Sequence, residues 1–360
     1  MTTPSLFSPF ALKSVTLRNR IGVSPMCQYS SEDGRATDWH LVHLGARALG
    51  GAGLIIAEAT AVTADGRISP QDAGLWNDTQ IEPLARITRF LSEHGAVPGV
   101  QLSHAGRKAS TQRPWEGNAQ VPESAGGWLP SGPSALAFRP DKERTPHELS
   151  REEIAGIIGA FCAATVRALA AGYRWLELHG AHGYLLHEFL SPLSNQRSDE
   201  YGGSFENRIR LGLEVTRAVR ATWPDHLPLT WRISATDWTG GGWTPEESVQ
   251  LAKRLKAEGV DLVDCSSGGN VPHAKIPVAP DYQVFLAERV RREAELPTAA
   301  VGMITEARQA DAIIREGKAD LVLIARESLR HPNWPLHAAK ELGLQDVLRA
   351  LTPPQYARSF

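Results

Sequence analysis

The residues best suited to chemistry in this chain are two imidazoles and a phenol within one hexapeptide, HGAHGY at positions 179–184. His179, His182 and Tyr184 follow the apolar run 174–178, which predicts a short buried strand. Two neutral imidazoles three residues apart can hydrogen-bond one oxygen atom, and a protonated phenol beside them can donate a proton to a neighbouring carbon. The hexapeptide therefore predicts a polarised substrate oxygen coupled to a proton transfer.

Short apolar runs alternate with longer amphipathic segments along the whole chain. The runs predict eight strands, at 21–25, 54–58, 97–102, 175–178, 229–233, 262–265, 298–301 and 321–324. Seven helices are expected between them, at 39–49, 80–94, 151–171, 205–223, 245–258, 282–295 and 306–316. This alternation favours an α/β fold, a (β/α)8 TIM barrel, in a single domain over residues 1–360. An open Rossmann sheet is disfavoured because its glycine-rich fingerprint is missing after the first strand.

Two segments fall outside this repeat. Residues 4–20 predict an N-terminal β-hairpin that plugs the bottom of the barrel. Residues 110–147, rich in Pro, Gly and Trp, are too long for a simple loop and predict a lid-like excursion after the third strand.

Polar side chains cluster where the predicted strands end. Cys27 and Tyr29 follow the first strand, QLSHAGRK at 101–108 ends the third, and Arg232 lies on the fifth. Active sites of parallel barrels lie at the carboxyl ends of the strands, so we expect these groups to line one pocket. Lys108 and Arg232 would then compensate a buried anion, although an isolated Arg107–Lys108 pair is more often a solvated corner.

The turns after the last two strands have the composition of a phosphate site. Gly302 permits close approach of the backbone, and Arg326 offers a forked guanidinium. Barrels often bind phosphate at this position, and SSGG at 266–269 is a further candidate loop. Together these turns predict a phosphorylated cofactor or substrate.

Two alternatives remain open at this point. The His179–His182 spacing also recurs in zinc sites, for which His104, His187, Glu58 and Cys27 could supply further ligands. One alternative function is therefore a zinc-dependent barrel hydrolase that uses His179, His182 and His104. A redox-sensing protein in which Cys27 reports oxidation would not be an enzyme.

Composition excludes several classes of partner. The net charge of −2 gives no global attraction to nucleic acid, and the three cysteines are too few and scattered for a disulfide framework. We find neither a signal peptide nor an apolar stretch approaching the ~20 residues that span a bilayer. These features predict a cytoplasmic protein that binds neither nucleic acid nor membrane.

Longer motifs carry a resemblance to a known family. They are SPMCQYSSEDG at 24–34, GLIIAEATAV at 53–62, QLSHAGRKAS at 101–110, HGAHGYLLHEFLSPLSNQRSDEYGGSFENR at 179–208, WRISATDW at 231–238, DCSSGG at 264–269, AVGMIT at 300–305 and the tail PPQYARSF. With these motifs the chain resembles the old yellow enzyme family of flavin-dependent ene-reductases over essentially its full length. It is most similar to the bacterial, thermophilic-like class, which has a cysteine near the flavin.

The resemblance implies the site residues and their roles. It implies non-covalent FMN as cofactor, NADPH or NADH as reductant, and small-molecule activated alkenes as substrates. FMN-binding residues would be Ser24, Pro25, Met26, Cys27, Ala59, Gln101, Lys108, Arg232, Gly302, Ala325 and Arg326. Of these, Cys27 would tune the flavin potential. His179, His182 and Tyr29 would bind the substrate, with Tyr184 as proton donor.

The resemblance also implies an assembly. Arg358, in the C-terminal tail 345–360, would reach the site of a neighbouring subunit in a homodimer or a dimer-based homotetramer. The chain departs from the family pattern at Ala325, where a glycine is often found. That replacement is tolerable only if the backbone there has a negative φ.

Overall fold

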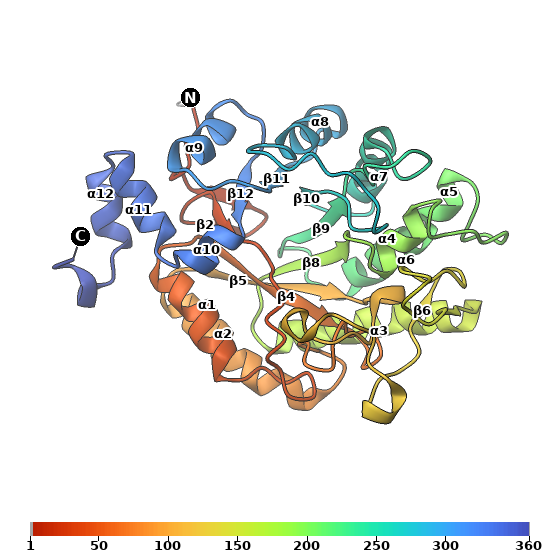
Figure 1. The fold of residues 1–360 in the computed structure, drawn as a ribbon. Helices are drawn as coiled ribbons and strands as arrows, with labels where there is room; N and C mark the ends of the chain where they lie inside the picture. The colour runs from red at the N-terminus through yellow and green to blue at the C-terminus, as the bar shows by residue number, and fades with distance from the viewer. Residues whose placement is uncertain (1–2, 360) are drawn as a thin grey trace.

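Eight parallel strands close into a barrel at the centre of the molecule (Figure 1), in a computed structural model that describes residues 3–359. The strands are β3 (Ile21–Val23), β4 (Leu54–Ala61), β5 (Val97–Ser103), β8 (Trp175–Gly180), β9 (Leu229–Ser234), β10 (Leu262–Ser266), β11 (Thr298–Val301) and β12 (Leu321–Ile324). The last strand, β12, pairs in parallel with the first, β3, and this pairing closes the barrel. Every predicted strand is present, so the (β/α)8 prediction is confirmed.

Helices alternate with these strands as the amphipathic segments predict. They are α1 (Asp38–Leu49), α2 (Ile81–Glu93), α3 (Arg151–Ala170), α6 (Arg210–Thr222), α7 (Pro245–Ala257), α8 (Val284–Ala294) and α9 (Ala307–Arg315). Ser150 and Thr244 form capping boxes that begin α3 and α7. The predicted helix 205–223 is divided into two helices, the short α5 (Phe205–Arg208) and α6.

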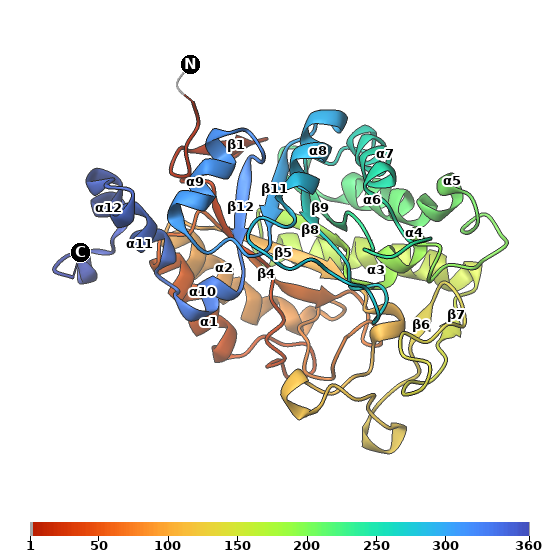
Figure 2. The same ribbon diagram turned by 45° about the horizontal axis from the view of Figure 1, so that its top comes forward.

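Four further helices were not predicted. The first, α4 (Leu185–Leu190), begins directly after Tyr184, and its six residues are all buried. A helix buried on every side lacks the apolar periodicity by which helices are recognised. The others follow β12: α10 (Arg326–Arg330), α11 (Trp334–Glu341) and α12 (Gln345–Leu351). In Figures 1 and 2, α11 and α12 extend from one side of the barrel and the chain ends beside them.

Both segments outside the repeat are ordered. The N-terminal hairpin pairs β1 (Phe10–Leu12) with β2 (Val15–Leu17), as predicted. The excursion contains two short 3-10 helices, Pro114–Glu116 and Glu123–Ala125, and the small strands β6 (Ser131–Gly132) and β7 (His147–Glu148). Figure 2 places it on the side of the barrel opposite α12.

One stacking contact holds the excursion against the barrel. The guanidinium carbon of Arg67 lies 5.1 Å from the ring centroid of Trp76 and 5.0 Å from that of Trp128. The indole N–H of Trp128 also donates to the carbonyl of Asp65, at 2.7 Å. A cation between two aromatic faces is attracted to both, so Trp128 fastens the excursion to the loop after β4.

Helix α3 corrects the expectation that no stretch of the chain is apolar and long enough to span a bilayer. Within residues 3–359 it is the one helix long and apolar enough, by length and composition, to cross a membrane. Its buried residues include Phe161, Ala164 and Ala168, none of which has exposed surface, and the helix packs beside α6. One such helix is weak evidence for a membrane span, since a helix that covers a barrel has the same composition.

Gly180, at the end of β8, provides a test of this packing. A Cβ atom there would lie 1.8 Å from Cζ3 of the buried Trp231. We expect Gly180→Ala to lower the free energy of unfolding by about 1–3 kcal/mol through overpacking, measured by chemical denaturation. Gly159→Ala, on the open face of α3 where nothing lies within 4 Å, should instead raise it by about 0.5–1 kcal/mol. Equal effects at both positions would contradict the packing described.

Candidate active site

The polar clusters predicted at the strand ends meet in one place. Tyr29 from the first cluster, Lys108 from the third strand and Tyr184 from the fourth line a single cavity of about 160 Å³. Phe138, from the excursion, forms another wall of this cavity. Cys27, Tyr29 and Tyr184 also pack against one small apolar cluster that includes Ala105. The expectation of a shared pocket is therefore confirmed for Tyr29, Lys108 and Tyr184, whereas His179, His182, Gln101 and Arg232 do not line this cavity.

The hexapeptide reaches this geometry through a left-handed turn. His179 lies within β8, whereas His182 and Gly183 adopt φ values of +60° and +71° before α4 begins. The ring centroid of His179 lies 5.3 Å from that of His182 and 5.2 Å from that of Tyr184. The backbone N–H of His182 donates to Oγ of Ser234, at 2.8 Å, which fastens the turn to β9. The turn thus gathers two imidazoles and a phenol from six consecutive residues.

Burial sets the protonation of these groups. It holds the pKa of His179 and of His182 well below the usual range, and the positive charge of Arg232 lowers both further. Burial also raises the pKa of the Tyr184 phenol well above its ordinary value. At neutral pH the site therefore holds two uncharged imidazoles beside a phenol that keeps its proton.

One buried nitrogen in the cluster has no partner. Nδ1 of His179 is buried and makes no hydrogen bond, whereas Nε2 of His182 lies 2.7 Å from Oγ of Ser266. A buried polar atom without a partner costs about 1–3 kcal/mol, and such atoms are uncommon in folded proteins. This nitrogen marks a position that a bound molecule would satisfy.

The barrel interior holds a layer of paired polar groups. Nε2 of Gln101 donates to Oε1 of Glu177 at 2.8 Å, and Nε of Arg232 lies 2.9 Å from Oδ2 of Asp264. Burial raises the pKa of the Glu177 and Asp264 carboxyl groups, whereas the positive charge of Arg232 lowers both values.

Arg107 and Lys108 are not the solvated corner that their sequence alone suggests. The Nη2 atom of Arg107 donates to the carbonyl of Asn270 at 2.7 Å. Nζ of Lys108 donates to the carbonyls of His182, at 2.8 Å, and Gly269, at 3.0 Å. Burial lowers the pKa of Lys108 to about 8. Both side chains hold loops of the site in place.

The loop after β3 is held in place by Glu58 of β4. Glu58 lies at a bulge in β4, where its Oε2 accepts a hydrogen bond from the backbone N–H of Gln28 at 2.8 Å. Its Oε1 lies 3.2 Å from Nε2 of the buried His40. Burial and then the charges of Asp72 and Glu58 raise the pKa of the Cys27 thiol well above its usual value. The sequence contains no spacing signal for this Glu58–His40 pair.

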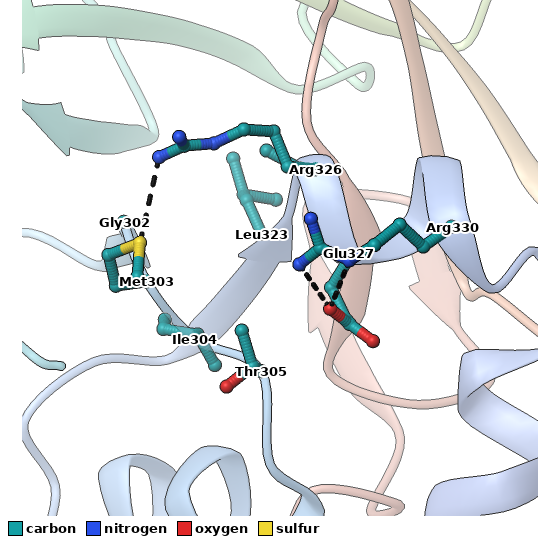
Figure 3. Close-up of a pocket in the computed structure, with 9 residues that line it drawn as sticks. Gly302, Met303, Ile304, Thr305, Leu323, Arg326, Glu327 and Arg330 are labelled. Atoms are coloured by element: carbon teal, nitrogen blue, oxygen red, sulfur yellow. Dashed lines mark hydrogen bonds and ion pairs between the residues drawn. The ribbon is translucent and has the colours of Figure 1, made fainter.

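The loops after β11 and β12 enclose a cavity of about 140 Å³ (Figure 3). It is lined by Gly302, Met303, Ile304, Thr305, Leu323, Ala325, Arg326, Glu327 and Arg330. Arg330 forms an ion pair with Glu327, whereas the guanidinium of Arg326 extends across the cavity to the sulfur of Met303, at 3.6 Å. Arg326 makes no contact with a carboxylate among the interactions of residues 3–359.

Two backbone features shape this cavity. Gly302 has a φ of +108°, and a Cβ atom there would lie 2.3 Å from Nε2 of Gln283. Ala325 has a φ of −101°, so the condition for an alanine at this position is met. The predicted loop 266–269 does not line the cavity. Its Ser266 contacts His182, and its Gly269 accepts from Lys108.

The remaining predicted residues lie in different places. Ser24 is buried, Pro25 and Met26 are half-buried beside it, and Ala59 lies on β4. Arg358 is exposed in the tail beyond α12. His104 lines a separate cavity with Asp65 and His147 rather than the cavity of Tyr184. Residue 360, the end of the predicted tail, lies outside the described residues.

The described residues do not form the ligand cluster that the zinc alternative requires. Among residues 3–359, no three His, Cys, Asp or Glu side chains are arranged to hold a metal ion. His187 and Glu58, which were candidate ligands, are instead engaged with Asp237 and His40.

Comparison with known proteins identifies the family. Residues 5–345 match the model of the NADH:flavin oxidoreductase / NADH oxidase family. The chain belongs to this family. It is 51% identical over 340 residues to a protein of Geobacillus sp. (strain WCH70) named NADPH dehydrogenase, covering 94% of each chain.

Solved structures agree with this family membership. The old yellow enzyme homologue from Zymomonas mobilis is 28% identical, with a TM-score of 0.79 over 94% of this chain and 93% of that one. A 2-naphthoyl-CoA reductase is 25% identical with a TM-score of 0.84, but this chain spans 52% of its length. The resemblance to the old yellow enzymes is confirmed, and this family member is an enzyme that uses FMN and a nicotinamide reductant.

The depressed pKa of His179 has a consequence for stability. Below about pH 6.5 the unfolded chain binds a proton that the native imidazole does not, so acidification favours unfolding. Each such histidine should lower the free energy of unfolding by up to about 1.4 kcal/mol per pH unit, with no contribution above neutral pH. Urea denaturation between pH 7.5 and 5.5 should show a shallower decline for His179→Asn than for the wild type. The exposed His273→Asn serves as control, and an unchanged slope for His179→Asn would refute a neutral buried imidazole.

Proposed function

We propose that this enzyme reduces activated C=C bonds of α,β-unsaturated carbonyl, imide or nitro compounds. The hydride comes from NADPH or NADH by way of FMN. The observation that carries this proposal is the close grouping of His179, His182 and Tyr184: the His179 ring lies 5.3 Å from that of His182 and 5.2 Å from that of Tyr184, and Nδ1 of His179 is unpartnered. Neutral donors aimed at one oxygen, beside a phenol that retains its proton, suit a reaction in which negative charge grows on that oxygen.

The residues present fit FMN. The cavity of Gly302, Ala325 and Arg326 offers a guanidinium free of carboxylates and backbone without bulky side chains, which suits a phosphate. In this proposal Gln101 and Arg232 bind the polar edge of the ring, with Lys108 behind them. Ser24, Pro25, Met26, Cys27 and Ala59 form the wall beside it. When bound and reduced, FMN supplies the hydride.

The chain's own residues would then activate the alkene. His179 and His182 hold the carbonyl or nitro oxygen, and Tyr29 closes the pocket from the other side. Because Nε2 of His182 contacts Ser266, its Nδ1 is the nitrogen left for this oxygen. Tyr184 donates its proton to the carbon next to the activating group. Nζ of Lys108, 4.9 Å from the centroid of the Tyr184 ring, would stabilise the phenolate that forms.

Cys27 favours the reductase over a redox sensor. A sensor thiol reacts as the thiolate, which requires a low pKa in an electropositive, accessible environment. Here burial and the negative charges of Asp72 and Glu58 raise the pKa of the Cys27 thiol. We therefore propose that Cys27 stays a thiol beside the flavin and tunes its reduction potential.

The assembly and location are part of the same proposal. Arg358 lies in an exposed tail beyond α12, where it is accessible to a neighbouring molecule. We propose a homodimer, alone or within a homotetramer, in which this arginine contacts the partner's substrate. Three scattered cysteines, all free in this fold, suit a cytoplasmic location.

Replacing Tyr184 by Phe tests the proton donor, since it removes only the hydroxyl. We expect the reoxidation of the reduced enzyme by an enone to slow by about 10²-fold or more. Reduction by NADPH, which needs no proton from Tyr184, should change little. Stopped-flow absorbance under argon measures the two half-reactions separately. Equal slowing of both would exclude Tyr184 as the donor.

Replacing Arg326 by Ala tests the phosphate site. Loss of one charge-assisted contact of about 1.5–3 kcal/mol should weaken FMN binding by about 10- to 100-fold. Riboflavin, which lacks the phosphate, should bind the variant and the wild type equally well. Fluorescence titration of the apoprotein measures both affinities, and a parallel loss of riboflavin affinity would place the phosphate elsewhere.

A further inference from the structure

We infer that the buried pair His187–Asp237 is a positioning device for the catalytic turn: Asp237 selects the tautomer of His187 that accepts a hydrogen bond from Gly183. Gly183 lies between His182 and Tyr184, so the device would hold both at their working positions. The effect on catalysis rests on the function proposed above, whereas the tautomer itself does not.

The tautomer follows from the contacts of His187. This side chain, on α4, is completely buried. Its Nδ1 accepts a hydrogen bond from the backbone N–H of Gly183, at 2.9 Å. An imidazole nitrogen that accepts carries no proton, so the proton of a neutral ring must reside on Nε2. That nitrogen lies 3.1 Å from Oδ1 of Asp237, within ion-pair distance, although the two atoms are not aligned as a hydrogen bond.

Asp237 is itself fixed in orientation. Its other oxygen, Oδ2, accepts from the hydroxyl of Ser191 at 2.6 Å and from the backbone N–H of Trp243 at 2.9 Å. Because these donors occupy Oδ2, Oδ1 is left to face His187. The carboxylate is fully buried, so no water competes for this position.

The turn depends on the N–H of Gly183. His182 and Gly183 are consecutive residues with positive φ, a conformation that costs energy for histidine. A Cβ atom at Gly183 would lie 2.4 Å from the carbonyl oxygen of Gly269, so the backbones there are in close contact. The hydrogen bond from Gly183 to His187 and the hydrogen bond from His182 to Ser234 both hold this strained turn in place. Without it, His182 and Tyr184 lose a shared anchor, and displacements near 1 Å cost about 10²-fold in rate.

Asp237→Asn tests the device because it changes one atom. Ser191 and Trp243 both donate, so the amide oxygen should take the Oδ2 position and leave the NH2 group facing His187. To accept from that NH2 group, Nε2 of His187 would have to lose its proton, and the proton would move to Nδ1. The N–H of Nδ1 and the N–H of Gly183 would then face each other as two donors, and their hydrogen bond would be lost. Long-range 1H–15N NMR of histidine-labelled holoenzyme distinguishes the tautomers, with the His187 signal assigned through a His187→Asn variant.

We expect Nε2–H in the wild type and Nδ1–H in Asp237→Asn. The variant should retain bound FMN, while its reoxidation by an enone slows by about 10- to 100-fold. Ser191→Ala is the matched control: it also removes a hydrogen bond from the same carboxylate but leaves the acceptor that faces His187. It should lower the thermal unfolding midpoint while preserving the wild-type tautomer and reoxidation rate.

Several results would overturn the inference. Nδ1–H or a doubly protonated His187 in the wild type would do so, even if Asp237→Asn fails to fold. A variant that switches tautomer yet reoxidises at the wild-type rate, or a Ser191→Ala enzyme that slows equally, would also refute it. If the wild type shows the expected tautomer but reduces no enone, the proposed function fails and the tautomer assignment stands.

Discussion

Burial of polar side chains at the carboxyl ends of the barrel strands is the constraint on which the rest of this structure depends. A polar group buried there must find a partner within the protein or in a ligand. Arg232 lies within ion-pair distance of Asp264, and Lys108 donates to two backbone carbonyls. The same burial keeps the imidazoles of the hexapeptide uncharged and the phenol protonated. The buried Nδ1 of His179 is among the atoms that find no such partner within the protein.

The barrel satisfies this constraint because its strands are parallel. All eight carboxyl ends open on one side, so loops from distant parts of the chain meet over the same opening. The loops after β11 and β12 form a cavity with a free guanidinium, those after β3 and β8 bring two phenols to another cavity, and the turn after β8 places its imidazoles beside Tyr184. The excursion, fastened through Arg67 and Trp128, adds Phe138 as a wall. A flavin phosphate and a small alkene thus suit different sectors of one surface.

Much of this arrangement could be predicted from the sequence. The strands were predictable because each is a short apolar run, and the grouping of Tyr29, Lys108 and Tyr184 because these residues follow such runs. Helix α4 was not, since a short helix buried on every side has no polar face. The burial of Lys108 was not predictable either, because its acceptors lie 74 and 161 residues away in the chain. The Glu58–His40 and His187–Asp237 pairs have no sequence signal either, since the two partners of each pair come from separate elements of the chain.

The central claim is that this site passes hydride from NADPH to an activated alkene. The most direct test bleaches the yellow holoenzyme with one equivalent of NADPH under argon and then adds an enone such as cyclohexenone. The account predicts that the flavin absorbance returns without oxygen and that saturated ketone forms in equal amount to the flavin reoxidised. A reduced enzyme that stays colourless with enones, imides and nitroalkenes, and regains its colour only in air, would contradict it.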